Sequence, residues 1–315
     1  MHTIGVVFPG QGSQYVGMGR ELCEASETAR LVFEEAKDVL GMDVSQLCFE
    51  GPKETLDLTV NTQVCLLAVE TAAFRVLRER TGITPSAMAG HSLGEYGALV
   101  AADALPFADA LKLVRARAAC QQKAVPAGEG CMAAIMGLDE DAVDRACREI
   151  SAEGAIVELA NINCPGQYVI SGHTSAVEAA LAKLRDMGAR RSVKLPVSIP
   201  SHCSLMKPAA AEFDHHFGSV RFSDCTVPVV PNCDPGNSHA PAASKDLLLR
   251  QLYSPVRWRE TVELMGQRGI DTIIEAGPKR VLAGLVARIR ETIRVLNVED
   301  AASLEKTASS LGENA

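Results

Sequence analysis

The sequence predicts an α/β fold in which helices cover both faces of a mostly parallel sheet, with a smaller unit inserted in the middle of the chain. Short apolar runs rich in β-branched residues alternate with segments of helical period along most of the 315 residues. Between about residues 127 and 196 the order of strands and helices differs from that of the rest of the chain. Gly128 and Gly130 at the start of this stretch and Pro196 at its end mark its borders. Apolar residues make up 47% of the chain and charged residues 22%, so the chain can bury a sizeable core.

The chain begins with a strand, a turn and two helices. Residues 4–8 form an apolar run that predicts a strand, and the turn residues 9–14 end it. Ser26 is placed to cap a helix whose apolar residues recur at helical spacing up to Gly41. Residues 62–80 are apolar on most sides of a helix, so we expect that helix to be buried between layers.

Residues 127–196 form a unit of their own, with four strands and two helices in the order βαββαβ. That order is the ferredoxin-like arrangement. Asp139 is placed to cap the first helix, and residues 163–166 predict a turn between two strands. We therefore divide the chain into a core of residues 1–126 and 197–315 and an inserted subdomain of residues 127–196. The expected strands of the subdomain span 131–136, 156–160, 167–171 and 192–195.

After residue 196 the chain returns to alternating strands and helices, which indicates a parallel sheet covered on both faces. The loop at 231–244 is rich in Pro, Asn, Ser and Ala, and we expect the polar last dozen residues to fray. The remaining expected helices of the core lie at 107–124, 207–217, 245–252, in a segment ending near 268, and at 281–290. The remaining expected strands lie at 197–199, 227–230, 272–275 and 293–298.

Composition and charge exclude several classes of protein. The formal net charge is −8 and no basic run interleaved with aromatics is present, which argues against a nucleic-acid partner. The ten cysteines contain no C-x-x-C pair, which favours reduced core thiols over disulfides or zinc. No basic leader and no run of 18 apolar residues occurs, so we expect a soluble, cytoplasmic protein without a membrane partner.

The strongest chemical signal is the sequence Gly90-His91-Ser92-Leu93-Gly94-Glu95. An apolar run at 87–89 precedes it and a small apolar run at 98–102 follows it, which predicts a strand, a sharp turn and a helix. In a G-x-S-x-G turn the glycines let the chain fold tightly, so the Ser92 hydroxyl would stand at a helix N-terminus. The helix dipole and the Leu93 N–H would stabilise an oxyanion. Ser92 is therefore a candidate nucleophile, and the alternative is a serine that only caps a helix.

A nucleophilic serine needs a base, and seven histidines are available. His202 stands out because it follows the strand expected at 197–199, which would bring it to the same sheet edge as Ser92. A histidine satisfied within the fold is the alternative for His202. His91 should point away from Ser92, and no acidic residue is an obvious third member of a triad. Three further histidines lie in polar stretches that we expect to be exposed: His215, His216 and His239.

Seven segments stand in the order and spacing of one known family. They are Pro9-Gly10-Gln11-Gly12-Ser13-Gln14, Gly90-His91-Ser92-Leu93-Gly94-Glu95-Tyr96, Arg117, Asn163-Cys164-Pro165-Gly166-Gln167, Pro200-Ser201-His202-Cys203, Gln251-Leu252-Tyr253-Ser254-Pro255-Val256 and Glu275-Ala276-Gly277-Pro278. From about residue 4 to 298 the chain thus resembles malonyl-CoA:acyl-carrier-protein transacylase, the free-standing acyltransferase of bacterial fatty-acid synthesis. The resemblance implies an α/β-hydrolase-like core interrupted by a ferredoxin-like subdomain, with the active site between them.

The resemblance also implies the catalytic roles. Ser92 would be the nucleophile and His202 the base. The family orients this histidine through a backbone carbonyl, here that of Gln251, which would explain the missing acid. The backbone amides of Gln11 and Leu93 would form the oxyanion hole.

The substrate carboxylate needs a partner as well, because a buried carboxylate is costly unless it is paired. By resemblance Arg117 would hold the free carboxylate of the malonyl group. The other substrate-binding residues implied are Gln251, Asn163 and Gln63.

The implied reaction is a ping-pong transfer of the malonyl group from malonyl-CoA to the phosphopantetheine thiol of acyl carrier protein, through malonyl-Ser92. No metal or redox cofactor is indicated, and we expect a monomer. Because the family's carrier protein is acidic, this net-negative enzyme should present a basic rim to it. The residues predicted to form that carrier-protein rim are Arg190, Arg191, Lys194, Arg288 and Arg290.

Other functions remain open from the sequence. A transacylase serving a polyketide synthase or malonate decarboxylase would share these motifs. A serine thioesterase would need water in the site and has no use for Arg117. An inactive module that only binds carrier protein is the third alternative, and intact Ser92, His202 and Arg117 argue against it. Gln121, Cys164 and Val64 depart from the residues frequent in the family, and we interpret Cys203 as a packing residue.

Overall fold

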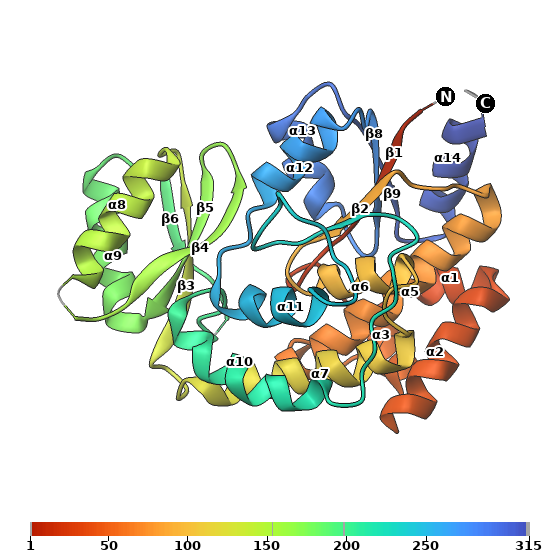
Figure 1. The fold of residues 1–315 in the computed structure, drawn as a ribbon, viewed down its shortest axis with the longest axis horizontal. Coiled ribbons are helices and arrows are strands. Elements are labelled where there is room, and N and C mark those ends of the chain that lie inside the picture. The colour runs from red at the N-terminus through yellow and green to blue at the C-terminus, as the bar shows by residue number, and fades with distance from the viewer. Residues whose placement is uncertain (1, 153, 198, 313–315) are drawn as a thin grey trace.

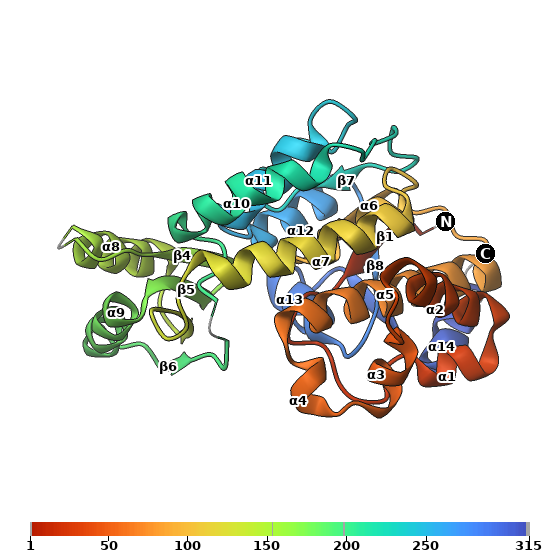
Figure 2. The same cartoon turned by 90° about the horizontal axis from the view of Figure 1, so that it is seen from below.

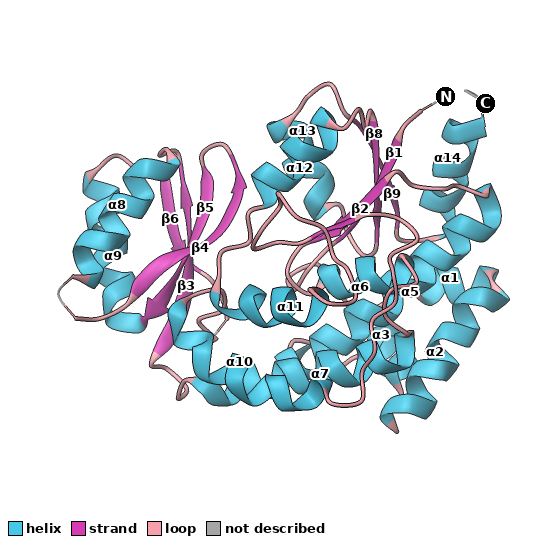
Figure 3. Ribbon diagram, in the orientation of Figure 1, coloured by secondary structure: helices cyan, strands magenta, loops and turns pink. Residues whose placement is uncertain are grey.

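The computed structural model describes residues 2–152, 154–197 and 199–312, and it confirms the predicted α/β fold class (Figure 1). Five strands form a parallel sheet in the order β7-β2-β1-β8-β9, and four form a separate antiparallel sheet in the order β4-β5-β3-β6. Figure 3 shows the two sheets side by side, with most of the helices around the parallel one. The parallel strands are β1 (Ile4–Phe8), β2 (Ala87–Gly90), β7 (Val229–Val230), β8 (Thr272–Ala276) and β9 (Arg294–Val298).

Alternate residues of β1 point to opposite faces of the parallel sheet, and different helices bury the two faces. Val6 and Phe8 belong to the larger core cluster, whereas Val7 belongs to the smaller one. The helices of the larger cluster are α1 (Arg20–Ala25), α2 (Glu27–Leu40), α3 (Val44–Glu50), α4 (Lys53–Leu56), α5 (Thr59–Thr81), α6 (Gly94–Ala101), α7 (Phe107–Ala124), α10 (Lys207–Asp214), α11 (Ser244–Tyr253) and α14 (Ala301–Gly312). Those of the smaller cluster are α12 (Trp258–Gln267) and α13 (Val281–Ile289).

Helix α5 is the central helix of the larger layer, as the apolar run at 62–80 predicts. It is long and apolar enough to cross a membrane, but 83% of an apolar 18-residue stretch of it is buried inside the protein, so it is a core helix. Within the part of the chain that the structure describes, no other helix meets that length and composition.

Local signals for helix ends are confirmed. The hydroxyl of Ser26 accepts a hydrogen bond from the Ala29 N–H at the start of α2, and Gly41 ends that helix at φ 64°. In the inserted unit, the Asp139 carboxylate accepts from the Ala142 N–H at 2.7 Å. These caps satisfy backbone groups that a helix end leaves without partners.

The inserted unit has the predicted βαββαβ order, with both helices on one face of its sheet (Figure 1). Its strand β4 continues through Cys164, so the hairpin turn is confined to Pro165 and Gly166 and is shorter than the predicted turn at 163–166. The boundaries at residues 127 and 196 stay a prediction. The elements are β3 (Gly130–Met136), α8 (Glu140–Ser151), β4 (Val157–Cys164), β5 (Gln167–His173), α9 (Thr174–Asp186) and β6 (Arg191–Lys194).

The inserted unit is hydrogen-bonded to the core along β4. The Ile162 N–H donates to the Val256 carbonyl, and the Val256 N–H donates to the Ala160 carbonyl, both at 2.9 Å. Val256 lies between α11 and α12, which Figure 2 shows on the side of the core where the inserted unit is attached. The two units therefore meet beside the carboxyl ends of the parallel strands.

One prediction about elements lies partly outside the described residues, and another needs correction. The strand expected at 197–199 includes residue 198, which lies outside the described residues, and the parallel sheet contains no strand that leads into His202 within the described ranges. The last dozen residues do not fray up to Gly312, because Leu304 of α14 is buried in the core and the Thr307 hydroxyl donates to the Asn297 carbonyl. Residues 313–315 lie outside the described part.

Candidate active site

The predicted serine turn connects β2 to α6 and places Ser92 in a left-handed backbone conformation, with φ 53°. Gly90 and Gly94 are required here, because a Cβ atom at either position would overlap backbone atoms. A non-glycine residue in this conformation costs roughly 1–3 kcal/mol and persists only where its surroundings hold it. Such strain is typical of a functional turn.

His202 lies at the serine hydroxyl, as predicted. The Ser92 Oγ and the His202 Nε2 are 2.8 Å apart, and the His202 Nδ1 is 2.8 Å from the backbone carbonyl oxygen of Gln251. Since a carbonyl only accepts, Nδ1 carries the proton and Nε2 is free to accept one from Ser92. Burial, and then the charge of Arg117, lower the pKa of His202 to about 3. The imidazole is therefore neutral at physiological pH and ready to act as a base.

The position of His202 is set by a turn rather than by a strand. Its φ is 64°, another left-handed conformation, and its N–H donates to the Leu252 carbonyl of α11. The same helix supplies the Gln251 carbonyl that orients the ring. Helix α11 thus holds both the backbone and the ring of His202.

Arg117 is buried on α7, with 1% of its surface exposed, and its guanidinium points at the serine. Its Nη2 donates to the Ser92 Oγ at 3.1 Å and to the Gln251 Oε1 at 2.9 Å. Its Nη1 donates to the Gln63 Oε1 at 2.7 Å and to the Gln121 Oε1 at 3.3 Å. All these acceptors are neutral, so a positive charge lies beside the nucleophile without a bonded counterion among the described residues.

One predicted oxyanion donor lies in the serine turn and the other in the loop after β1. Gln11 follows β1, and Leu93 directly follows Ser92. Within the described residues neither backbone N–H donates a hydrogen bond, although the Gln11 side chain donates to the Thr59 hydroxyl at 3.2 Å. Two free N–H groups near a nucleophile are what an oxyanion hole requires.

Asn163 reaches the site through a neighbour. Its Oδ1 is 3.0 Å from the Nε2 of His91, and the His91 ring packs against Trp258. His91 points away from the serine hydroxyl, as predicted, and burial lowers its pKa. Asn163 lies on β4 of the inserted unit, so this contact joins that unit to the serine turn.

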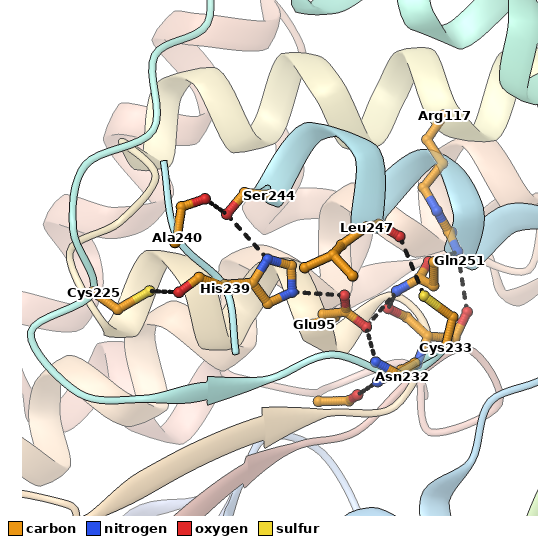
Figure 4. Close-up of polar contacts among 12 residues, drawn as sticks. Glu95, Arg117, Cys225, Asn232, Cys233, His239, Ala240, Ser244, Leu247 and Gln251 are labelled. Carbon is orange, nitrogen blue, oxygen red and sulfur yellow. Dashed lines mark hydrogen bonds and ion pairs between the residues drawn. The ribbon is translucent and has the colours of Figure 1, made fainter. Parts of the chain in front are cut away.

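Three polar residues beneath the serine escaped prediction: Glu95, Asn232 and His239. His239 was expected to be exposed, and this is wrong, because only 5% of its surface is accessible and its Nε2 is 2.9 Å from the Glu95 Oε1. Figure 4 shows the two side chains facing each other. Glu95 had a signal in the sequence, since it is the one charged residue of the small apolar helix after Ser92. His239 had none, because only the fold brings its loop to α6.

The predicted rim residues lie away from the serine. The Arg190 side chain packs against Gly137, whose N–H donates to the Gly166 carbonyl, and Arg288 donates to the neighbouring Pro165 carbonyl at 3.3 Å. Arg190, Arg191 and Arg288 therefore surround one turn region of the inserted unit. By contrast, the Lys194 ammonium is paired with Glu178 at 2.9 Å, and Arg290 lies against Gly266 of α12.

The cysteines are all free thiols, and nine of the ten are buried. Burial raises the pKa of Cys203 to about 11, and its thiol donates to the Pro200 carbonyl at 3.1 Å. A thiol held in this state is a poor nucleophile. Among the described residues, no cluster of three or more His, Cys, Asp or Glu side chains could hold a metal ion.

Several known proteins are similar to this chain over nearly its whole length. The acyl transferase domain family matches residues 6–313. The malonyl CoA-acyl carrier protein transacylase of Bacillus subtilis (strain 168) is 44% identical over 99% of this chain and 98% of its own length. The solved structure of the malonyl CoA-acyl carrier protein transacylase of Coxiella burnetii has a TM-score of 0.96 at 40% identity, over 98% of each chain. A malonyl-transacylase in complex with a type II PKS acyl-carrier protein has a TM-score of 0.95 at 46% identity, over 98% of this chain and 99% of that one.

Proposed function

This chain belongs to the acyl transferase family, among the malonyl-CoA:acyl-carrier-protein transacylases, and from this premise we propose that Ser92, His202 and Arg117 carry out its reaction. The enzyme transfers the malonyl group from malonyl-CoA to acyl carrier protein, for fatty-acid synthesis. The observation that carries the residue assignment is the continuous hydrogen-bonded chain from Arg117 through Ser92 and His202 to the Gln251 carbonyl.

Acylation begins with the neutral His202. Its Nε2 takes the Ser92 hydroxyl proton as Oγ attacks the thioester carbonyl of malonyl-CoA. The negative charge moves to the carbonyl oxygen, where the N–H groups of Gln11 and Leu93 stabilise it. The intermediate collapses with loss of the CoA thiolate, which takes the proton from His202. Malonyl-Ser92 and free CoA thiol result.

Arg117 selects the acyl group. The malonyl carboxylate replaces a neutral amide oxygen on the guanidinium, and a paired charge is far more favourable than either partner buried alone. Gln63 and Gln251 keep the guanidinium in place until then, since their Oε1 atoms bond its two terminal nitrogens. A neutral acyl group has no carboxylate to pair with the guanidinium, so its binding is less favourable.

The second half reverses the first. The phosphopantetheine thiol of acyl carrier protein gives its proton to His202 and attacks the malonyl-serine ester. The Ser92 alkoxide leaves and recovers the proton. No metal or redox cofactor takes part, because the substrates supply every group that is transferred.

The charge of the surface around the inserted unit suggests where acyl carrier protein binds. A carrier protein with acidic residues would dock against Arg190, Arg191 and Arg288, the three predicted rim residues that lie around one turn region of the inserted unit. Asn163 would contact the substrate from that side of the site. We also propose a cytoplasmic monomer, because Ser92, His202, Arg117 and Gln251 already contact one another within one copy of the chain.

The mass of the intact protein tests this function. After brief exposure to malonyl-CoA, the wild-type protein should gain one malonyl group, which added acyl carrier protein removes. Ser92→Ala should gain none. Release of free malonate without an adduct or transfer would instead indicate a thioesterase.

A further inference from the structure

We propose that Glu95 is a positioning residue, whose buried carboxylate aligns the nucleophile, the base and the substrate-binding arginine through Asn232 and Gln251. It lies in the first turn of α6, three residues after Ser92, and none of its surface is exposed. A carboxylate removed from water in this way needs several donors. The inference deepens the proposed function and rests on it for the identity of the nucleophile.

The carboxylate of Glu95 has three partners from three segments of the chain. Its Oε2 accepts from the Asn232 backbone N–H at 2.8 Å and from the Gln251 Nε2 at 2.9 Å. Its Oε1 is 2.9 Å from the Nε2 of His239. Figure 4 shows Glu95 between His239 on one side and Asn232 and Gln251 on the other. Both oxygens are therefore engaged, and the carboxylate has a single orientation.

Two of these partners hold the peptide groups of the nucleophile. The Asn232 Oδ1 accepts from the Ser92 N–H at 2.6 Å, and its Nδ2 donates to the Gly90 carbonyl. The Gln251 Nε2 donates to the Ser92 carbonyl at 2.8 Å. The strained φ of Ser92 is thus fixed from both sides by side chains that Glu95 holds in place.

Glu95 also determines which way the Gln251 amide faces. The two N–H bonds of its Nε2 go to Ser92 and Glu95, so its Oε1 must face the guanidinium of Arg117. The backbone carbonyl of the same residue orients His202. One carboxylate therefore stands a single residue away from all three groups that carry the reaction.

The test compares Glu95→Ala, Glu95→Gln and Glu70→Gln with the wild-type protein. The alanine variant leaves the Asn232 N–H and one Gln251 N–H without their acceptor, so the Gln251 amide can turn. A misplacement of this kind should slow acylation by malonyl-CoA about 100-fold at saturating substrate. The glutamine variant keeps an acceptor oxygen toward Asn232 and Gln251 and can donate to His239, so it should recover most of the rate.

Glu70→Gln is the matched control for removing a buried carboxyl from the same core. Glu70 is fully buried on α5, and its carboxyl has no hydrogen-bond partner within the described ranges. This variant should acylate at the wild-type rate. The folded fraction of each variant, from a urea unfolding curve, corrects each rate to active protein.

Phenylmethanesulfonyl fluoride separates this inference from the proposed function. Serine Oγ attacks its sulfur, fluoride leaves and His202 takes the proton, so the reaction needs an aligned serine but no malonyl recognition. The same order, with wild type and Glu95→Gln fast and Glu95→Ala slow, should appear with this reagent even if malonyl-CoA gives no adduct. A wild-type rate for Glu95→Ala per folded molecule, or an equal loss in Glu95→Ala and Glu95→Gln, would overturn the proposal.

Discussion

If the charge of Arg117 selects the acyl group, as proposed, its contacts predict the cost of losing it. Arg117→Ala leaves a substrate carboxylate buried without a partner, which costs about 3–5 kcal/mol for a broken buried pair. We expect acylation by malonyl-CoA to fall at least about 100-fold, with a much smaller loss for acetyl-CoA. Intact-mass rates with both thioesters measure this.

Arg115→Ala is the control for Arg117, because Arg115 lies two residues earlier on α7 and donates to the Leu40 carbonyl instead. Its rates should stay close to those of the wild-type protein. An equal loss with malonyl-CoA and acetyl-CoA in Arg117→Ala would contradict a role in carboxylate recognition.

His202 should remain an effective base at acid pH. Because burial and Arg117 lower its pKa to about 3, it stays unprotonated down to pH 5.5, where a histidine of pKa near 6.5 would lose about tenfold in active form. The rate of Ser92 modification by phenylmethanesulfonyl fluoride, a reagent without a titrating group, should therefore change little from pH 8 to 5.5. An inflection near pH 6.5 would show that the imidazole is not shielded in this way.

At the level of residues, the sequence was sufficient to predict which groups meet at Ser92 and insufficient for those that hold them in place. Ser92 is marked by its turn motif, and His202, Arg117 and Gln251 by their place in the family pattern. Glu95 and Asn232 act through hydrogen bonds between segments more than 130 residues apart, and these depend on the packed fold. The polar neighbours of His239 in sequence predict a place at the surface, whereas the fold buries its ring between Glu95 and Ser244.

Helix α5 contains a buried acid whose titration opposes folding. Burial, and then the nearby Glu275, raise the pKa of Glu70 well above its usual 4.5. The folded protein therefore keeps the Glu70 carboxyl protonated at pH values where the unfolded chain has already lost that proton. The free energy of unfolding is therefore unaffected by this group below pH 4.5 and decreases as the pH rises above it. The Glu70→Gln variant does not lose stability in this way, because a glutamine side chain does not titrate.

The unfolding free energy of Glu70→Gln relative to wild type should therefore increase with pH above about 4.5, by up to about 1.4 kcal/mol per pH unit. Urea unfolding at pH 5 and pH 8 measures the difference. A difference that is the same at both pH values would mean that Glu70 titrates alike in the folded and unfolded chains.

Among the elements, long periodic segments such as α2, α5 and α7 and the serine turn were predictable, whereas the C-terminal helix was not. Composition suggested that the last dozen residues would fray, yet a single buried leucine, Leu304, packs α14 against the core. Pro200 and Ser201 indicate a turn at His202, but its left-handed conformation has no local signal and accompanies the hydrogen bond to Leu252. Strand β4 extends past its predicted end because Asn161, Ile162 and Cys164 continue to pair with β5.

The whole molecule has a net charge of −8, so a basic surface must be local if it is to attract an acidic partner. Arg190 and Arg191 of the inserted unit, together with Arg288 of α13, would provide one around the turn at Pro165 and Gly166. Arg190→Glu and Arg191→Glu should each raise the apparent KM for acyl carrier protein, with an effect that weakens at high salt, and leave the KM for malonyl-CoA unchanged.

Lys112→Glu makes the same change of charge on α7 and should alter neither KM. Steady-state kinetics with each substrate varied at low and at high salt would distinguish these outcomes. An equal rise in both KM values for the Arg191 variant would count against a docking role.

The active site joins residues far apart in the chain, and this has a consequence for protein synthesis. Ser92 emerges from the ribosome 110 residues before His202 and 159 before Gln251. Until those residues have emerged and α11 has packed, Ser92 has no base, and its carbonyl lacks the hydrogen bond from the Gln251 side chain. A nascent chain therefore cannot acylate itself, and reactivity appears only late in synthesis, when the core closes around α11.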